Sequence, residues 1–128
     1  MKGFDMASFD DQVQAAIGAH GMWKARLRQA VDSGSSEFKV DVVRLDDRCD
    51  FGRWLYGEAR QVHGSDSQFE LVRKLHAEFH VEAAKVLGHA MAGNKGQAEA
   101  SMGIGGQFSR VSSSLIGALA KWRAAAAA

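Results

Sequence analysis

Apolar residues recur at three- and four-residue steps along most of the chain, which is the spacing of one face of an α-helix. Three long blocks and one short block carry this pattern: 8–32, 46–56, 67–92 and 95–125. Stretches rich in glycine, serine and asparagine separate them: 33–36, 63–65 and 93–96. Residues 38–43 alternate as a strand would, but one short strand cannot form a sheet. The pattern therefore predicts an all-α protein.

The apolar stripes also predict how the helices pack. The first block carries Val13, Ile17, His20, Lys24, Leu27 and Val31. The third carries Phe69, Val72, His76, Phe79, Ala83, Val86 and Ala90, and the fourth carries Ala98, Met102, Phe108, Val111, Leu115, Leu119 and Trp122. No single helix can bury its own stripe, so the stripes must face one another. We predict an antiparallel four-helix bundle with an additional short helix that carries Cys49.

Residues that favour helix ends refine these boundaries. The expected N-caps are Ser8, Asp46 or Asp47, and Ser67, and the expected C-cap of the short block is Gly57. Three glycines at 103, 105 and 106 lie inside the fourth block, where each costs ~1 kcal/mol relative to alanine. They either allow a close approach of two helices or mark a kink.

Length and composition limit the classes of protein to consider. The chain has 128 residues, of which 46% are hydrophobic and 24% are charged, and it contains no proline. These values indicate one packed domain, residues 1–128 with a core at about 8–123. The formal charge of +1 argues against a dedicated nucleic-acid-binding protein. No apolar run approaches the roughly 18 residues of a membrane span.

Cysteine usage and the N-terminal residues indicate the compartment. A single cysteine excludes an internal disulfide and is typical of a reducing environment. The first residues lack the apolar stretch of a secretory signal. We therefore expect a cytoplasmic protein.

Four residues form a candidate metal site: His20, Cys49, His76 and His80. His76 and His80 are four residues apart, which places both imidazoles on one helix face. His20 lies on the apolar stripe of the first helix. Cys49 lies near the start of the short helix, where backbone N–H groups would favour its thiolate. Three imidazoles and one thiolate suit tetrahedral zinc.

Each of these residues also has a plain structural interpretation. A lone histidine on an apolar stripe is commonly a core residue bonded to a carbonyl, and a lone cysteine is commonly a small buried apolar residue. Two histidines four residues apart arise easily in helices. Four polar groups on inward faces would nevertheless be costly to bury without a shared partner.

The residues around these four form three motifs. HxxWK begins at His20, CxFGxWLxG begins at Cys49, and HxxFH spans His76 to His80. In this order and at these separations, the motifs resemble the chemoreceptor zinc-binding domain family. The resemblance is strong over about residues 20–87.

The resemblance implies a fold, a cofactor and a role. It assigns His20, Cys49, His76 and His80 as ligands of one zinc ion inside a four-helix bundle that often forms homodimers. Family members usually lie beside chemoreceptor signalling segments or diguanylate cyclase domains, and act as cytoplasmic sensors of zinc or oxidants. It therefore implies an output in chemotaxis or cyclic-di-GMP signalling. Trp23 and Trp54 match aromatic positions of the family, and we expect them to keep the site dry.

A regulatory zinc site is more consistent with these residues than an enzyme. Four protein ligands close the coordination sphere, whereas catalytic zinc usually keeps one position for water. The histidine pair reads HAEFH, not HExxH, so the metalloprotease base is missing. Glu78 should point to another face. Oxidation of Cys49 would loosen one of four bonds and free its segment.

Two other functions remain as alternatives. A di-iron bundle would need several carboxylates at Glu-x-x-His spacing, which Glu70, Glu78 and Glu82 do not provide. A purely structural helical interaction module would bind no metal.

The remaining polar residues have secondary roles. His63 and His89 are expected in solvent. Asp46, Asp47 and Asp50 are expected either to bond histidine N–H groups or to cap helices.

Overall fold

The computed structural model describes residues 6–127, and within this range every regular element is helical. The long helices are α1 (Met6–Ser33), α5 (Ser67–Met91) and α7 (Gln107–Ala127). The shorter elements are α2 (Val40–Val43), α3 (Asp50–Trp54), the π-helical turn η1 (Leu55–Ala59), α4 (Arg60–His63) and α6 (Lys95–Met102). Residues 1–5 and 128 of the predicted domain lie outside the described residues.

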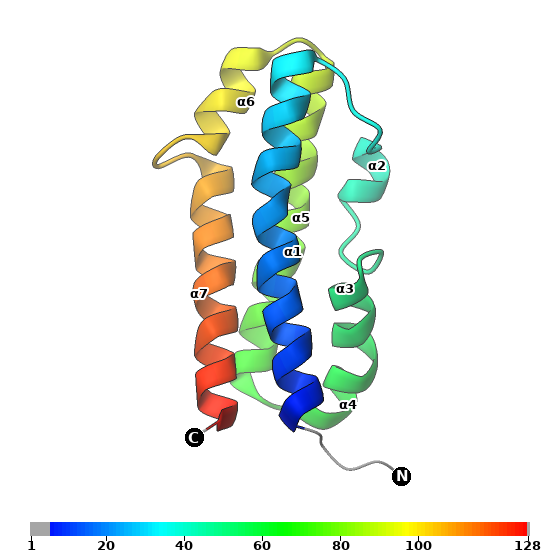
Figure 1. The fold of residues 1–128 in the computed structure, drawn as a ribbon, viewed down its shortest axis with the longest axis vertical. Helices are drawn as coiled ribbons and strands as arrows, with labels where there is room; N and C mark the ends of the chain where they lie inside the picture. The colour runs from blue at the N-terminus through cyan, green and yellow to red at the C-terminus, as the bar shows by residue number, and fades with distance from the viewer. Residues whose placement is uncertain (1–5, 128) are drawn as a thin grey trace.

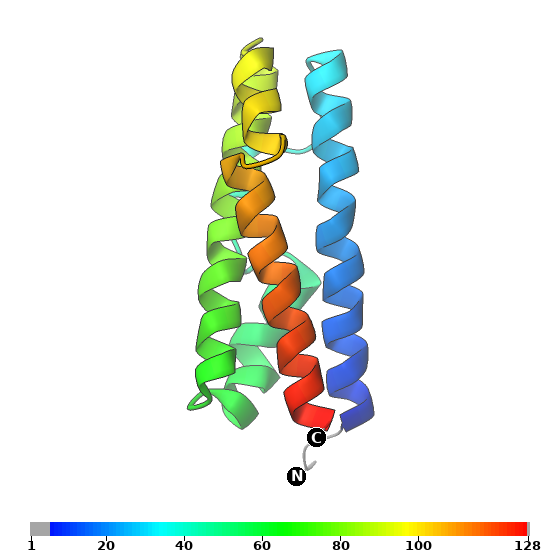
Figure 2. The same cartoon turned by 90° about the vertical axis from the view of Figure 1, so that its left-hand side faces the viewer.

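The helices form the predicted antiparallel bundle. Figure 1 shows α1 rising from the end where the chain starts, the segment from α2 to α4 descending, α5 rising and the pair α6–α7 descending. Figure 2 shows α7 in front of α1 and α5, and α7 packs against both. The short helices α2, α3 and α4 follow one another on the other side of α1 and α5 and occupy the fourth position of the bundle. The predicted short helix beside Cys49 is α3, and it is part of this fourth position of the bundle.

The predicted apolar stripes face the core. All the stripe residues expected on α5, α6 and α7 are buried, and so are four of the six expected on α1. Ile17 is half-buried and Lys24 is exposed. Lys24 therefore lies at the margin of the stripe, where its ammonium group stays in water.

The predicted N-caps of the first and third blocks are wrong. Ser8 lies inside α1, which begins at Met6. The N-cap of α5 is Asp66, whose carboxylate accepts a hydrogen bond from the backbone N–H of Gln68. Asp66 precedes Ser67 in the sequence, and an aspartate caps a helix as well as a serine does.

The fourth predicted block is two helices, so the glycine cluster marks a break. Gly105 has φ +79°, a left-handed conformation that favours glycine. A Cβ atom on Gly106 would stand 2.2 Å from the carbonyl oxygen of Ala100. Two side-chain bonds hold the break: the Phe108 N–H donates to the Ser101 hydroxyl, and the Ser109 hydroxyl donates to the Met102 carbonyl.

The short elements differ most from the predicted pattern. The strand-like residues 38–43 include helix α2. Cys49 is itself the N-cap of α3, in place of Asp46 or Asp47. The predicted C-cap Gly57 has non-helical backbone angles, φ −101° and ψ −105°, and marks a kink between two helical stretches, the second of which ends at His63. A glycine at a kink is a common cause of such a change in helix direction.

An aromatic cluster fills the core at the end of the bundle where α1 begins and α7 ends. Trp122 is buried, with its ring centroid 4.9 Å from that of Phe9 and 6.0 Å from that of Trp54.

Within residues 6–127, no helix combines the length and the apolar character needed to cross a membrane.

Candidate metal centre

Four side chains from three separate segments converge in the middle of the bundle. His20 comes from α1, Cys49 from the loop before α3, and His76 and His80 from α5. One nitrogen of each imidazole and the Cys49 sulfur all lie within 4.8 Å of one another. The three histidines are at most 3% exposed and Cys49 is half-buried. The structure therefore brings together all four residues that the sequence singles out.

The closest pairs of these atoms are nearly in mutual contact. The Cys49 sulfur lies 3.4 Å from Nε2 of His76 and 3.6 Å from Nε2 of His80. The two Nε2 atoms are 3.1 Å apart. The i, i+4 spacing on α5 brings the two rings together, because one helical turn superimposes their side chains.

Backbone carbonyls determine which nitrogen of two of the rings faces the cluster. Nδ1 of His20 donates to the carbonyl of Ala16 at 2.7 Å, and Nδ1 of His80 donates to the carbonyl of Val43 at 2.8 Å. Each proton therefore resides on Nδ1, which leaves the Nε2 lone pair directed into the cluster. Metal-binding histidines are commonly oriented by such a bond on the other ring nitrogen.

Burial keeps the three imidazoles neutral. It lowers the pKa of His20 to about 4, although the bond to Ala16 opposes the shift. Burial, with a smaller effect of the neighbouring histidines, lowers the pKa of His76 to about 2. Burial also lowers the pKa of His80. A neutral imidazole with a free lone pair is the form that binds a metal ion.

Cys49 differs from the expectation of a favoured thiolate. Its sulfur accepts the backbone N–H of Gly52 at 3.3 Å, so the helix N-terminus contacts it as predicted. Burial nevertheless outweighs this bond, and the pKa of the Cys49 thiol is raised. In the absence of a cation the thiol form is therefore favoured, because a buried thiolate lacks sufficient compensation.

The separations among Cys49, His76 and His80 fit a tetrahedral metal ion. Bonds of about 2.0–2.1 Å to nitrogen and about 2.3 Å to sulfur, in a tetrahedron, place two nitrogens roughly 3.3 Å apart and a nitrogen and a sulfur roughly 3.6 Å apart. The observed pairs at 3.1, 3.4 and 3.6 Å lie close to these values. The set of four that includes His20 spans up to 4.8 Å, so one ion bound by all four residues requires a small approach of the donors. Without a shared cation, the thiol of Cys49 and one N–H of His76 are the only protons available within the cluster, Nδ1 of His76 has no partner among the described residues, and burying unpaired polar groups is costly.

Phenylalanines, rather than tryptophans, form the apolar walls of the cluster. Phe51 lies 5.1 Å from His76, and Phe79 lies 5.1 Å from His20, between ring centroids. Trp54 packs behind Phe51 at 5.6 Å. Trp23 lies further along α1, where it packs against Phe38. Trp54 therefore supports one wall from behind, Trp23 lines the same cavity as His20, and the expectation that both tryptophans keep the site dry stays a prediction.

Neighbouring polar residues also differ from expectation. Among the described residues, Nδ1 of His20 and of His80 bonds a backbone carbonyl and Nδ1 of His76 has no hydrogen-bond partner, so Asp46, Asp47 and Asp50 bond none of the three rings. Asp46 instead accepts a hydrogen bond from the Tyr56 hydroxyl. This hydrogen bond links the two ends of the segment 46–56, which contains Cys49. The sequence pattern did not indicate this bond.

The remaining candidates lie outside the cluster. Glu78 is exposed, as expected for its face of α5. His89 is half-buried. His63 is half-buried against Phe9 and Trp122, with ring centroids 5.2 and 5.4 Å away, rather than free in solvent.

One of three comparisons with known proteins gives a match. Comparisons with curated proteins and with solved structures give no significant match. The profile described as the chemoreceptor zinc-binding domain, CZB, matches residues 20–87. This range is more than half of the chain, and it begins at His20 and includes Cys49, His76 and His80. The chain therefore belongs to the chemoreceptor zinc-binding domain family.

Proposed function

We propose that this chain is a zinc-binding sensory module in which His20, Cys49, His76 and His80 hold one Zn(II) ion. The observation that carries the proposal is the convergence of three histidine nitrogens and one cysteine sulfur within 4.8 Å in a largely buried site. Nitrogen and sulfur donors in this number are typical of zinc. Within residues 6–127, no carboxylate joins this cluster, which argues against the di-iron alternative.

The role of the site is regulatory rather than catalytic. Four protein ligands leave no position for a reacting water molecule. The bound cation would supply positive charge that favours the Cys49 thiolate and ties together three segments: α1, the loop before α3, and α5. Loss of the cation would release the loop most readily, because α1 and α5 pack along their whole lengths whereas the loop connects two short helices.

Cys49 is the ligand through which a signal would act. It is the half-buried member of the four, and its segment can move without unfolding the bundle. A peroxide would transfer one oxygen atom to the thiolate, giving a sulfenate and releasing water or an alcohol. The oxidised sulfur would bind zinc more weakly, so either zinc level or thiol oxidation would change the position of the loop.

The output would be a change in contacts with a signalling partner. We propose a cytoplasmic homodimer that acts on a chemoreceptor or a diguanylate cyclase domain, in the same chain or in a separate one. The family membership supports this assignment.

Elemental analysis of the protein purified without added metal tests the zinc site. We expect about one zinc ion per chain, and much less in the variants Cys49→Ala and His76→Ala. His89→Ala is the matched control, because His89 lies on the same helix α5 outside the cluster. A parent protein that holds no zinc, even after zinc is added back, would support a purely structural bundle and contradict the proposal.

Cys49→Ser tests the role of the thiolate as the mobile ligand. The hydroxyl group is a poorer zinc ligand than a thiolate. We expect weaker zinc binding in competition with a chelating dye, and faster hydrogen exchange in the segment from α2 to α4. Unchanged zinc affinity together with unchanged exchange would exclude this role.

A further inference from the structure

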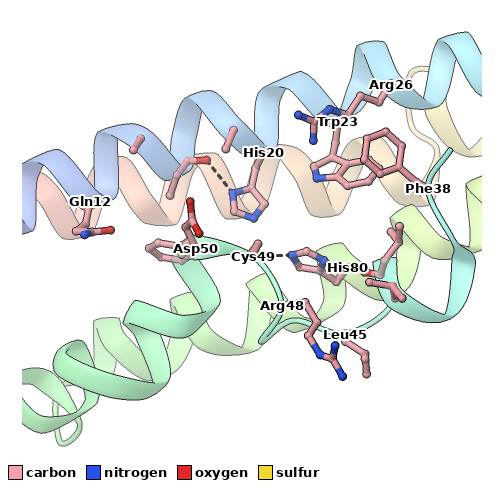
Figure 3. A pocket seen from close by; sticks show the side chains of 16 residues that line it. Gln12, His20, Trp23, Arg26, Phe38, Leu45, Arg48, Cys49, Asp50 and His80 are labelled. Atoms are coloured by element: carbon pink, nitrogen blue, oxygen red, sulfur yellow. Dashed lines mark hydrogen bonds between the residues drawn. The ribbon is translucent and has the colours of Figure 1, made fainter.

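A cavity of about 410 Å³ opens beside the four-residue cluster, between α1 and residues 38–51 (Figure 3). Its walls are mainly apolar, and its volume lies within the ~300–1,000 Å³ range of small-molecule sites. His20, Cys49 and His80 contribute to the wall, whereas His76 does not. A molecule in this cavity would therefore touch three of the four residues of the candidate metal centre.

Small side chains on α1 create this hollow. Ala15, Ala16 and Ala19 line it, and their methyl groups leave space that larger residues would fill. Trp23, one turn beyond Ala19, packs against Phe38 with ring centroids 5.0 Å apart. These two rings limit one end of the cavity (Figure 3).

A guanidinium group lies over the same two rings. The central carbon of the Arg26 guanidinium is 5.1 Å from the Trp23 ring centroid and 5.2 Å from that of Phe38. Stacking of this kind holds a guanidinium flat and leaves its N–H edge available for an anion. In the part of the chain that the structure describes, Arg26 forms no ion pair.

The other charges of the lining leave Arg26 as the main anion-binding group. The acidic residue of the lining, Asp50, has a fully exposed side chain and pairs with Arg53 at 3.4 Å. Arg48 lies at the rim, largely exposed, 3.8 Å from the Asp47 carboxylate. A half-buried, stacked and unpaired guanidinium beside apolar walls favours a ligand that is both apolar and negatively charged.

We propose that this cavity binds a small amphipathic anion, with an aromatic or branched apolar body between α1 and residues 38–51 and a carboxylate or similar acidic group on Arg26. The apolar body would cover the alanines and the face of the cluster formed by His20, Cys49 and His80. Binding does not depend on the proposed zinc function. Any effect of the ligand on zinc affinity does rest on it, and the two effects would be reciprocal.

Two fluorescent probes of one shape test the proposal on the full chain as purified. Anilinonaphthalene sulfonate carries one negative charge, and N-phenylnaphthylamine has the same aromatic body without the charge. We expect the anionic probe to bind to a single site and at least about fivefold more tightly than the neutral probe, because Arg26 contributes a charged contact.

Matched variants locate the site. Ala19→Trp fills the cavity and should abolish binding of both probes, whereas Ala25→Trp places the same side chain on an exposed position of α1 outside the lining. Arg26→Gln should remove the preference for the anionic probe, and Arg26→Lys should retain part of it. Circular dichroism confirms folding, and Ala15→Leu offers a smaller plug if Ala19→Trp fails to fold.

Three results would overturn the proposal: equal affinity for the two probes, equal binding by Ala19→Trp and Ala25→Trp, or no binding at all. Repeating the titration after zinc is removed separates the two proposals. Probe binding by a parent protein that holds no zinc, even after zinc is added back, would contradict the proposed function alone. A full zinc content with no probe binding would contradict this inference alone.

Discussion

Gly52 lies directly against the backbone of Asp46. A Cβ atom on Gly52 would stand 1.9 Å from the Asp46 carbonyl oxygen and 2.9 Å from its carbonyl carbon. The chain before Cys49 therefore passes over the first turn of α3 at a distance that only glycine allows. This contact explains why the motif that starts at Cys49 has a glycine three residues later.

Gly52→Ala is expected to destabilise the protein and displace Cys49. The new methyl group would meet backbone atoms that cannot rotate away, and overpacking of this kind costs about 1–3 kcal/mol. Urea unfolding measures the loss of stability, and competition with a chelating dye measures the accompanying loss of zinc affinity. Gly88→Ala is the matched control, since nothing lies within 4 Å of its Cβ position. Equal effects of both variants would show that the close contact is unimportant.

The fold was largely predictable because its long helices repeat apolar residues with a helical period. The stripes on α5 and α7 consist of residues such as Phe79 and Leu119, which are fully buried. Periodicity fails for short elements, because residues 38–43 contain too few positions to separate a strand from a turn of helix. It also fails at the glycine break before α7, where the left-handed conformation of Gly105 is a property of a single residue.

The candidate site was predictable in its residues but not in its surroundings. The three motifs identified His20, Cys49, His76 and His80, which the fold brings together. The backbone acceptors of His20 and His80 could not be identified, because a carbonyl carries no signature of residue type. The thiol pKa was mispredicted because helix position suggested a lowered value while burial, which depends on tertiary packing, raises it.

Tyr56→Phe is expected to loosen the loop that carries Cys49. The Tyr56 hydroxyl donates to the Asp46 carboxylate, so the two residues hold the ends of the segment that contains Cys49. Removing the hydroxyl leaves a half-buried carboxylate without this donor, at a cost of about 1 kcal/mol. In the zinc-free protein, Cys49 should react faster with iodoacetamide. Asp47→Asn changes an exposed neighbouring carboxylate and serves as the control, and an alkylation rate unchanged by Tyr56→Phe would exclude this role for the hydroxyl.

Acidification is expected to destabilise the zinc-free protein between pH 7 and pH 5. Burial lowers the pKa of His20 from 6.5 to about 4 and that of His76 from 6.5 to about 2. Below pH 6.5 the unfolded chain takes up protons that the folded chain excludes, so this contribution is complete above about pH 6.5 and is lost as the pH falls. The loss at pH 5 is about 2 kcal/mol for each histidine.

Urea unfolding at the two pH values measures this effect. His76→Gln should show a smaller loss than the parent protein, whereas His89→Gln on the same helix should match the parent. A midpoint that stays constant from pH 7 to pH 5 in the parent would contradict the assignment of these histidines as buried and neutral.

Two glycine-to-alanine variants, one in the helix break and one within α7, should change stability in opposite directions. Gly105 has φ +79°, and its Cβ position has nothing within 4 Å, so an added methyl group would cost backbone strain alone. The left-handed conformation costs a non-glycine residue about 1–2 kcal/mol. Gly117 lies on the exposed side of α7 with equally open space, and alanine there should stabilise the helix by up to about 1 kcal/mol.

Thermal unfolding should therefore give a lower Tm for Gly105→Ala and a higher Tm for Gly117→Ala. Stabilisation by both variants would mean that α6 and α7 can join into one helix, as the periodicity of residues 95–125 predicts, and that the break is weakly enforced.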